Sequence, residues 1–221
     1  MAGDRPRICT AVTTDDISLI ERAAPYTDYY ELRIDHIGNN WQQLAKKLSK
    51  PWIATNRRRE EGGVWSGGEE DRIATLISSL ALKPAMIDIE LQTPLLQDTA
   101  NYIKGKAELI ISYHDFQSTP SLDELEYIIV RMRDAGADIC KVVTTACSMD
   151  DNIRILQLAR EFRGKKLACF AMGEPGMLSR VLAPLAGSCL TYASLGTGVA
   201  SAPGQMNVSD MRKLYELIDA V

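Results

Sequence analysis

Histidines and paired cysteines are scarce in this sequence. Its 221 residues include two histidines, His36 and His114, and five cysteines with no C-x-x-C pair. Neither histidine has a cysteine at ligand spacing, so we expect no metal site. The cysteine count is odd, and four of the five lie inside apolar runs. This pattern indicates small buried side chains in a reducing compartment, and we therefore expect a cytoplasmic protein.

Long apolar segments are also absent. Residues 1–12 contain no apolar h-region, which argues against a secretory signal. The longest stretch without a charge, Val181 to Ser209, is interrupted throughout by Gly, Pro, Ser and Thr. It therefore predicts a loop-rich functional region and not a membrane helix. The net charge of −4 gives no reason to expect nucleic acid or an anionic membrane as a partner.

The sequence is rich in short β-branched runs, most of them followed by a helical pattern. Eight runs are candidate strands, at residues 7–12, 29–35, 51–57, 85–91, 108–114, 138–143, 167–173 and 189–195. Ser121 and Glu124 form a predicted capping box for the helix after the fifth run. Ser209 is the predicted N-cap of the last helix.

Strand–helix alternation repeated eight times is typical of a parallel sheet covered by helices. The eight units fill 221 residues with no linker and no shift in composition. This favours an α/β fold with one domain, a (β/α)8 TIM barrel over residues 1–221, and leaves an open doubly wound sheet as the alternative.

Ionisable residues lie on the predicted strands, mostly near their carboxyl ends. The layer between strands and helices must be apolar, so a charged strand residue points into the barrel, and barrels of this kind carry active sites at the carboxyl ends of the strands. Each group alone could solvate a loop. Together they predict one shared rim, because unpaired buried charge is costly. The ionisable groups are Glu31, Arg33 and Asp35; Arg57; Asp88 and Glu90; His114, which shares its face with Ser112; and Lys141.

Lys141 is the most informative of these residues, since it stands between Cys140 and Val142 in an apolar run. Burial disfavours its ammonium form and favours a neutral amine, although Asp88 or Glu90 nearby would oppose this. A neutral amine attacks carbonyl carbons and forms a Schiff base, which acidifies the adjacent C–H bonds. His114 suits the proton transfer that follows.

Two further groups complete this chemistry. A carboxylate such as Glu61 would hold the imidazole in one orientation. The planar forks of the arginines match a carboxylate, which predicts an anionic substrate.

Several stretches, in order along the chain, resemble the type I 3-dehydroquinate dehydratases, the Schiff-base branch of the enzymes that catalyse the third step of the shikimate pathway. The stretches are "ELRID", "RRREEGG", "ISYHDF", "DICKVV", "MGEPGMLSR" and "SAPGQ". Singly, only the third and the last are distinctive, but together they cover most of the chain.

The resemblance implies that Lys141 forms an imine with the C3 ketone of 3-dehydroquinate. His114 would take a proton from C2 and protonate the departing C1 hydroxyl in a syn elimination, and Glu61 would orient His114. The remaining matched residues imply substrate contacts, from Arg180 to the carboxylate, from Glu31, Arg33, Arg57, Ser201 and Gln205 to the ring hydroxyls, and from Met172 as an apolar wall. No metal and no organic cofactor is implied.

The chain departs from the family pattern in three places. Bacterial members usually begin with a hairpin that plugs the barrel, and we expect the short form without it here. Phe170 stands where the family often has methionine. Near Ser194, where an aromatic often packs on the substrate, either Tyr192 or nothing is expected to do so.

Two other functions are compatible with parts of this pattern. A Schiff-base aldolase acting on a phosphorylated sugar or hydroxy-acid would use the same lysine, with the glycines at 196 and 198 cradling a phosphate. A non-catalytic barrel that binds a hydroxy-acid would not need a buried amine. We expect no nucleic-acid or membrane partner, and we expect a homodimer formed through outer helices.

Overall fold

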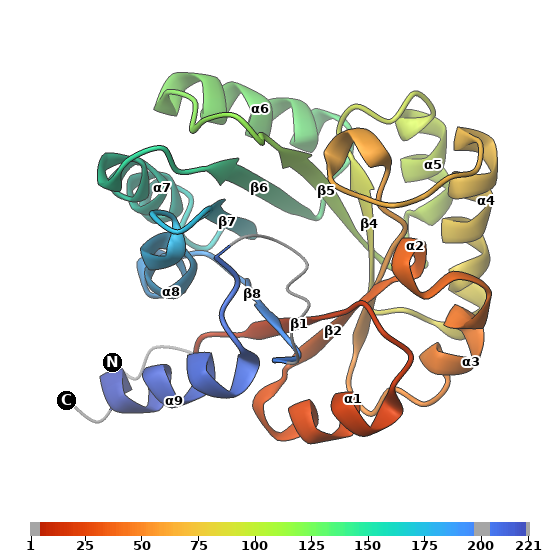
Figure 1. Ribbon diagram of the computed structural model, residues 1–221. Coiled ribbons are helices and arrows are strands. Elements are labelled where there is room, and N and C mark those ends of the chain that lie inside the picture. Colours follow the sequence, from red (N-terminus) through yellow and green to blue (C-terminus); the bar gives the residue numbers. More distant parts are fainter. Residues whose placement is uncertain (1–4, 197–203, 220–221) are drawn as a thin grey trace.

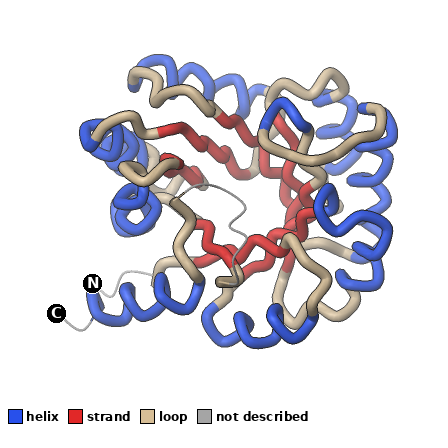
Figure 2. The backbone as a smooth tube through the Cα atoms, viewed as in Figure 1, coloured by secondary structure: helices blue, strands red, loops and turns tan. Residues whose placement is uncertain are grey.

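The computed structural model describes residues 5–196 and 204–219. Figure 2 shows its strands as an inner ring with the helices outside it. The strands are β1 (Ile8–Val12), β2 (Tyr29–Arg33), β3 (Trp52–Thr55), β4 (Met86–Glu90), β5 (Glu108–His114), β6 (Ile139–Thr145), β7 (Leu167–Met172) and β8 (Thr191–Ser194).

Helices connect the strands and cover them (Figure 1). The α-helices are α1 (Ile17–Ala23), α2 (Ile34–Ile37), α3 (Trp41–Ala45), α4 (Glu69–Ser78), α5 (Leu96–Ile103), α6 (Leu122–Asp134), α7 (Met149–Glu161), α8 (Met177–Ala186) and α9 (Val208–Asp219). Short 3-10 helices are η1 (Ala24–Tyr26), η2 (Gly38–Asn40), η3 (Arg59–Glu61) and η4 (Ser79–Leu82). Among the described residues, none of the helices is long and apolar enough to cross a membrane.

The eight strands form one parallel sheet in the order β7-β6-β5-β4-β3-β2-β1-β8. The two end strands meet through irregular contacts in place of a ladder: the Cys189 amide donates to the Leu167 carbonyl oxygen at 2.7 Å, and the Cys169 amide donates to Ser188 Oγ at 3.1 Å. The sheet is therefore a nearly closed (β/α)8 barrel, which confirms the predicted fold.

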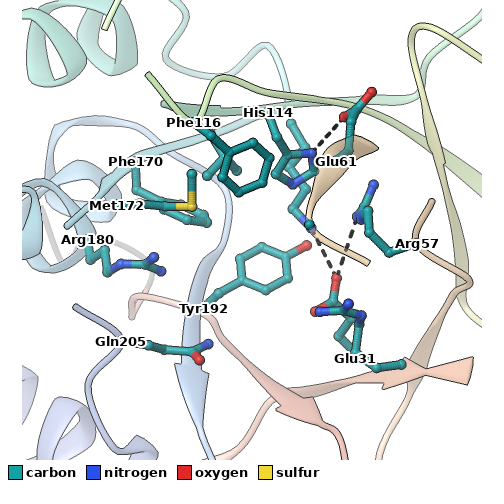
Figure 3. Close-up of a pocket in the computed structure, with 14 residues that line it drawn as sticks. Glu31, Arg57, Glu61, His114, Phe116, Phe170, Met172, Arg180, Tyr192 and Gln205 are labelled. Atoms are coloured by element: carbon teal, nitrogen blue, oxygen red, sulfur yellow. Dashed lines mark hydrogen bonds and ion pairs between the residues drawn. The ribbon is translucent and has the colours of Figure 1, made fainter. Parts of the chain in front are cut away.

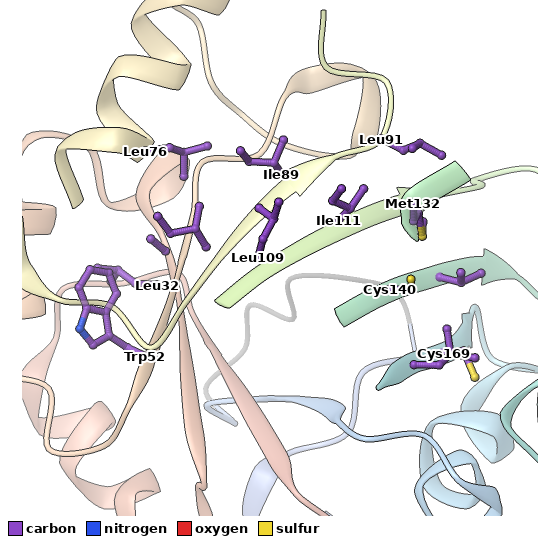
Figure 4. Packing of buried hydrophobic residues seen from close by; sticks show 14 of the residues in the cluster. Leu32, Trp52, Leu76, Ile89, Leu91, Leu109, Ile111, Met132, Cys140 and Cys169 are labelled. Carbon is purple, nitrogen blue, oxygen red and sulfur yellow. The ribbon is translucent and has the colours of Figure 1, made fainter. Parts of the chain in front are cut away.

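Alternation along the strands separates two apolar layers. Outward side chains such as Leu32, Ile89 and Ile111 pack under the helices in the main core (Figure 4). Inward side chains such as Ile53 and Ile110 form a second cluster inside the barrel. Successive side chains of a strand point to opposite faces, and both faces are apolar here because burial of each removes apolar area from water.

The barrel interior changes from apolar to charged along several strands. In β4, Met86 belongs to the inner apolar cluster, whereas Asp88, which follows it on the same face, is a buried carboxylate. In β6, Ile139 is followed in the same way by Lys141. The charged groups therefore gather at the carboxyl ends of the strands, where the predicted rim lies.

Local details confirm one predicted cap and correct another. Ser121 and Glu124 form the expected capping box of α6. Ser209 is not the N-cap of α9, because that helix begins at Val208 and the side chain of Asn207 accepts from the Ser209 amide at 2.9 Å. Strand β3 ends at Thr55, so Arg57 lies in the following loop and not at the strand end.

Candidate active site

One pocket opens at the carboxyl ends of the strands (Figure 3). Its walls come from β2, β5, β6, β7 and β8, from the loop after β3 and from α8. The lining residues are Glu31, Arg33, Arg57, Glu61, Gly62, His114, Phe116, Lys141, Val143, Phe170, Met172, Arg180, Tyr192 and Gln205.

Lys141 lies at the centre of this pocket with its side chain almost wholly buried. Its Nζ donates to Glu31 Oε1 at 3.0 Å and to Asp88 Oδ2 at 2.9 Å. The same nitrogen lies 4.2 Å from the centroid of the Tyr192 ring. Three strands thus fix the position of the amine, which is the preorganisation that a nucleophile needs.

Arg57 shares the carboxylate of Asp88 with Lys141. Its guanidinium donates to Asp88 at 2.8 Å, to Glu90 at 3.0 Å and to Ser112 Oγ at 2.6 Å. Burial alone would raise the pKa of Asp88, but the positive charges of Arg57 and Lys141 hold that pKa well below its usual value. Asp88 therefore remains a carboxylate that holds the two cations in place.

His114 and Glu61 form a second pair at the pocket wall. His114 Nδ1 lies 2.9 Å from Glu61 Oε2, which leaves Nε2 for a ligand. Burial lowers the pKa of His114 well below its usual range, so the imidazole is neutral near pH 7. Burial also raises the pKa of Glu61 to about 7. An ionised Glu61 accepts a hydrogen bond from the protonated Nδ1. This leaves the Nε2 lone pair free to act as a base.

Arg180, on α8, is the third charged feature. The residue is 1% exposed, and its Nε and Nη2 have no hydrogen-bond partner among the described residues. The guanidinium lies 4.4 Å from the centroid of the Phe170 ring. Burial lowers the pKa of Arg180 to about 10, so the group is still a cation near pH 7. A buried cation without a partner is costly, and a carboxylate in the pocket would satisfy it.

Arg33 also reaches the pocket, but it already has a partner. Its Nε and Nη2 donate to the two carboxylate oxygens of Asp35, at 2.9 and 2.7 Å. Asp35 belongs to α2 and not to the strand, and it also accepts from the Val64 amide at 3.1 Å. This carboxylate thereby ties the end of β2 to the loop that follows Glu61.

The structure brings nine of the ten predicted site residues to this pocket: Lys141, His114, Glu61, Glu31, Arg33, Arg57, Arg180, Met172 and Gln205. The tenth, Ser201, lies outside the described residues. Arg57 is 3% exposed and faces the pocket, whereas Arg58 forms an ion pair with the exposed Glu60. The second carboxylate on Lys141 is Glu31 and not Glu90, because Glu90 accepts from Arg57 and Arg72.

Sequence reasoning missed part of the lining. The family resemblance does not indicate Phe116 or Val143, and the sequence does not decide whether Phe170 and Tyr192 contact the substrate; all four line the pocket. Strand alternation could have placed three of them, since Val143, Phe170 and Tyr192 share an inward face with Lys141, Met172 and Ser194 respectively. Phe116 lies in a loop, where alternation gives no signal.

Known proteins similar in sequence to this chain over most of its length share one family and one name. The family described as Type I 3-dehydroquinase matches residues 8–221. A 3-dehydroquinate dehydratase of Dehalococcoides mccartyi (strain CBDB1) is 42% identical over 214 residues, covering 97% of this chain and 96% of that relative. One of Methanosarcina acetivorans is 39% identical over 208 residues, covering 86% of this chain and 85% of the relative.

Solved structures show the same likeness. The crystal structure of the 3-dehydroquinate dehydratase from Aquifex aeolicus VF5 aligns with a TM-score of 0.84 at 27% identity, covering 97% of this chain and all of that one. A dihydropteroate synthase from Xanthomonas albilineans aligns with a TM-score of 0.61 at 13% identity, which shows a shared fold alone.

Proposed function

The chain belongs to the type I 3-dehydroquinase family, and from this premise we propose that it dehydrates 3-dehydroquinate to 3-dehydroshikimate through an imine on Lys141. One observation carries the proposal: a buried amine, a neutral histidine held by a carboxylate, and an arginine without a partner surround one pocket. The enzyme is thus a hydro-lyase of the shikimate pathway.

Lys141 supplies the nucleophile. The Lys141 ammonium first gives up one proton within the site, so that its nitrogen can add to the C3 ketone carbon. That proton and a second one from the nitrogen go to the former carbonyl oxygen, which leaves as water. The nitrogen keeps its third proton in a protonated imine, which draws electrons from the C2–H bond. Burial between Glu31 and Asp88 supports this role, since both carboxylates stabilise the positive charge that the imine nitrogen carries.

His114 carries the proton of the elimination. Its neutral Nε2 takes the proton from C2, and the resulting imidazolium returns it to the departing C1 hydroxyl, so that atoms and charge balance. Glu61 accepts from Nδ1 and stabilises the imidazolium between the two transfers. Water then hydrolyses the imine and releases the product.

The remaining pocket residues bind the substrate in this proposal. Arg180 pairs with its carboxylate, because no carboxylate of the described chain occupies that position. Glu31, Arg33, Arg57 and Gln205, which line the pocket, would contact the ring hydroxyls, and Met172 would contribute an apolar wall. Ser201 keeps its proposed hydroxyl contact from the family resemblance alone.

An activity assay tests the proposal. The purified enzyme is expected to convert 3-dehydroquinate to a conjugated enone, followed by its ultraviolet absorbance, and Lys141→Ala is expected to remain folded and lose turnover. Lys213→Ala, which changes an exposed lysine on α9, serves as the matched control. Turnover retained by Lys141→Ala would overturn the proposal.

The aldolase and the non-catalytic binder are not favoured. The family match and the unpartnered Arg180 suit a carboxylate substrate, and the glycine at 198 that could cradle a phosphate lies outside the described residues. Turnover of a phosphorylated sugar, with none of 3-dehydroquinate, would reverse this choice.

We further propose a cytoplasmic homodimer. All five cysteines carry free thiols, which suits a reducing compartment. Four large apolar side chains are exposed on α6 and α7: Tyr127, Val130, Met149 and Ile153. Covering these side chains would remove apolar area from water. Light scattering is expected to give twice the mass of 24.4 kDa for the wild type, and the monomer mass for Tyr127→Glu.

A further inference from the structure

Tyr192 has a hydroxyl group that nothing assigned so far uses. The residue is 3% exposed, and its Oη has no hydrogen-bond partner among the described residues. A buried hydroxyl without a partner costs about 1–3 kcal/mol, so its presence in a native site calls for an explanation. Of the described pocket residues, Tyr192 and Arg180 are the two with such atoms.

The ring of Tyr192 is held on two sides. Lys141 Nζ lies over it at 4.2 Å, and the Phe170 ring lies against it at 5.6 Å between centroids. Tyr192 faces the barrel interior because its neighbours Thr191 and Ala193 face outward, where Thr191 donates to the Arg180 carbonyl oxygen and Ala193 joins the core under α9. The hydroxyl therefore has a fixed position in the pocket, on the ring over which the Lys141 amine lies; Figure 3 shows Tyr192 among the lining residues.

Other donors near the amine are already engaged. The Ser112 hydroxyl donates to Asp88, and the Thr55 hydroxyl donates to Glu31. The Arg57 guanidinium donates to Asp88, Glu90 and Ser112. Burial raises the pKa of Tyr192 well above its usual value, so its phenol keeps its proton and can donate.

We propose that the Tyr192 hydroxyl donates a hydrogen bond to the ketone oxygen of the substrate as Lys141 attacks the ketone carbon. A ketone suits the place because it has a carbon for the amine and, one bond away, an oxygen for the hydroxyl. As the C–N bond forms, the electron pair of the C=O π bond moves to oxygen. The Tyr192 donor stabilises this developing negative charge in a site that excludes water. The inference rests on the imine chemistry proposed above.

The test measures imine formation by itself. In a His114→Ala background the elimination is blocked, so the protein is mixed with 3-dehydroquinate, quenched with borohydride at timed intervals and weighed by mass spectrometry. Adding Tyr192→Phe is expected to slow the gain of adduct mass at least about 10-fold, since removing one oxyanion donor typically costs more than this. The same substitution is expected to leave the melting temperature of the free protein unchanged or higher, because it removes a hydroxyl that has no partner.

Tyr30→Phe is the matched control. Tyr30 is equally buried, but its hydroxyl donates to the Ile20 carbonyl oxygen at 3.0 Å. This control is expected to lower the melting temperature and leave adduct formation unchanged. The inference is overturned if the His114→Ala protein that also carries Tyr192→Phe gains adduct mass as fast as His114→Ala alone. It is also overturned if Tyr192→Phe lowers the melting temperature as Tyr30→Phe does. Absence of any adduct in the His114→Ala parent would instead count against the proposed function.

Discussion

At the scale of single residues, the pocket holds two kinds of charged side chain. Lys141 and Arg57 are neutralised by carboxylates within 3.0 Å, and Arg33 is paired with Asp35. Arg180 has no such partner, although it is buried to the same degree. The pocket lining therefore includes one positive charge without a partner among the described residues, and such a charge favours an anionic ligand.

Substitution of Arg180 tests this assignment. Arg180→Met is expected to lower kcat/KM at least about 100-fold, because two charge-assisted hydrogen bonds of about 1.5–3 kcal/mol each are lost. Most of the loss is expected in KM, since the carboxylate is bound equally in the ground state and the transition state. Arg22→Met, which changes an exposed arginine on α1, is the control. A normal KM with a reduced melting temperature would show that Arg180 is structural.

The His114–Glu61 pair predicts a specific dependence on pH. Below pH 7 a protonated Glu61 donates to Nδ1, which moves the imidazole proton to Nε2 and removes the base. Because the folded pKa of Glu61 is raised to about 7, kcat/KM of the wild type is expected to rise with pH through about 7. The His114 imidazole stays neutral over this range and contributes no second step there.

Glu61→Gln separates this effect from other ionisations. The amide oxygen can still accept from Nδ1 but does not ionise, so the rise near pH 7 is expected to disappear. The rate at pH 8 is expected to fall about 10- to 100-fold, because the imidazolium loses its counter-charge. A pH–rate profile that keeps the rise near pH 7 in this variant would assign the ionisation to another group.

At the scale of elements, the loop after β3 positions two of the site residues. Arg57 lies near its start and Glu61 lies four residues later, at the end of η3. Just after Glu61 the chain turns back so closely that a Cβ on Gly63 would lie 1.9 Å from the Arg57 carbonyl oxygen. Gly62 has a φ of +77°, which glycine adopts without strain. The glycine pair thus allows the loop to bring Glu61 against His114.

Gly63→Ala is expected to separate these residues. The backbone must shift to admit the methyl group, so we expect a lower melting temperature and a kcat reduced about 10-fold or more, as small displacements at a reacting centre are costly. Gly68→Ala lies in the same loop, where the nearest atom to a new Cβ is 3.8 Å away, and is expected to change neither value much. Equal behaviour of the two variants would contradict this account of the loop.

The sequence predicted the strands better than it predicted the loops and the contacts between strands. Alternation of inward charged and outward apolar residues made β2, β4 and β6 recognisable, because both periodicity and burial act within each strand. The partner of Lys141 could not be chosen between carboxylates, since that depends on the register between strands far apart in the chain. The predicted strand at 51–57 included Arg57, whereas β3 ends at Thr55, and only the family resemblance indicated that Arg57 contacts the substrate.

At the scale of the whole molecule, buried ion pairs tie the barrel strands to the helix layer. Glu90 on β4 accepts from Arg57 Nη1 at 3.0 Å and from Arg72 Nη1, on α4, at 2.8 Å. Arg72 is fully buried and also donates to Glu69 and Thr93. Removing one member of such a network leaves uncompensated charge in the interior.

Glu90→Gln is therefore expected to be strongly destabilising. Breaking a buried ion pair lowers the free energy of unfolding by about 3–5 kcal/mol. In a chain of this size each kcal/mol lowers the melting temperature by about 2–4 °C, so we expect a fall of about 10 °C. Glu21→Gln, on an exposed face of α1, is the control. Differential scanning calorimetry that shows equal transitions for both variants would contradict the structural role of this network.

The central claim is that Lys141 becomes covalently attached to its substrate. Wild-type enzyme is incubated with 3-dehydroquinate, reduced with borohydride and digested, and its peptides are mapped by mass spectrometry. The reduced adduct is expected on the peptide containing Lys141, and it is expected to be absent from Lys141→Ala and present in Lys213→Ala. Unmodified protein under conditions where the ligand saturates the pocket, or an adduct on a different lysine, would contradict it.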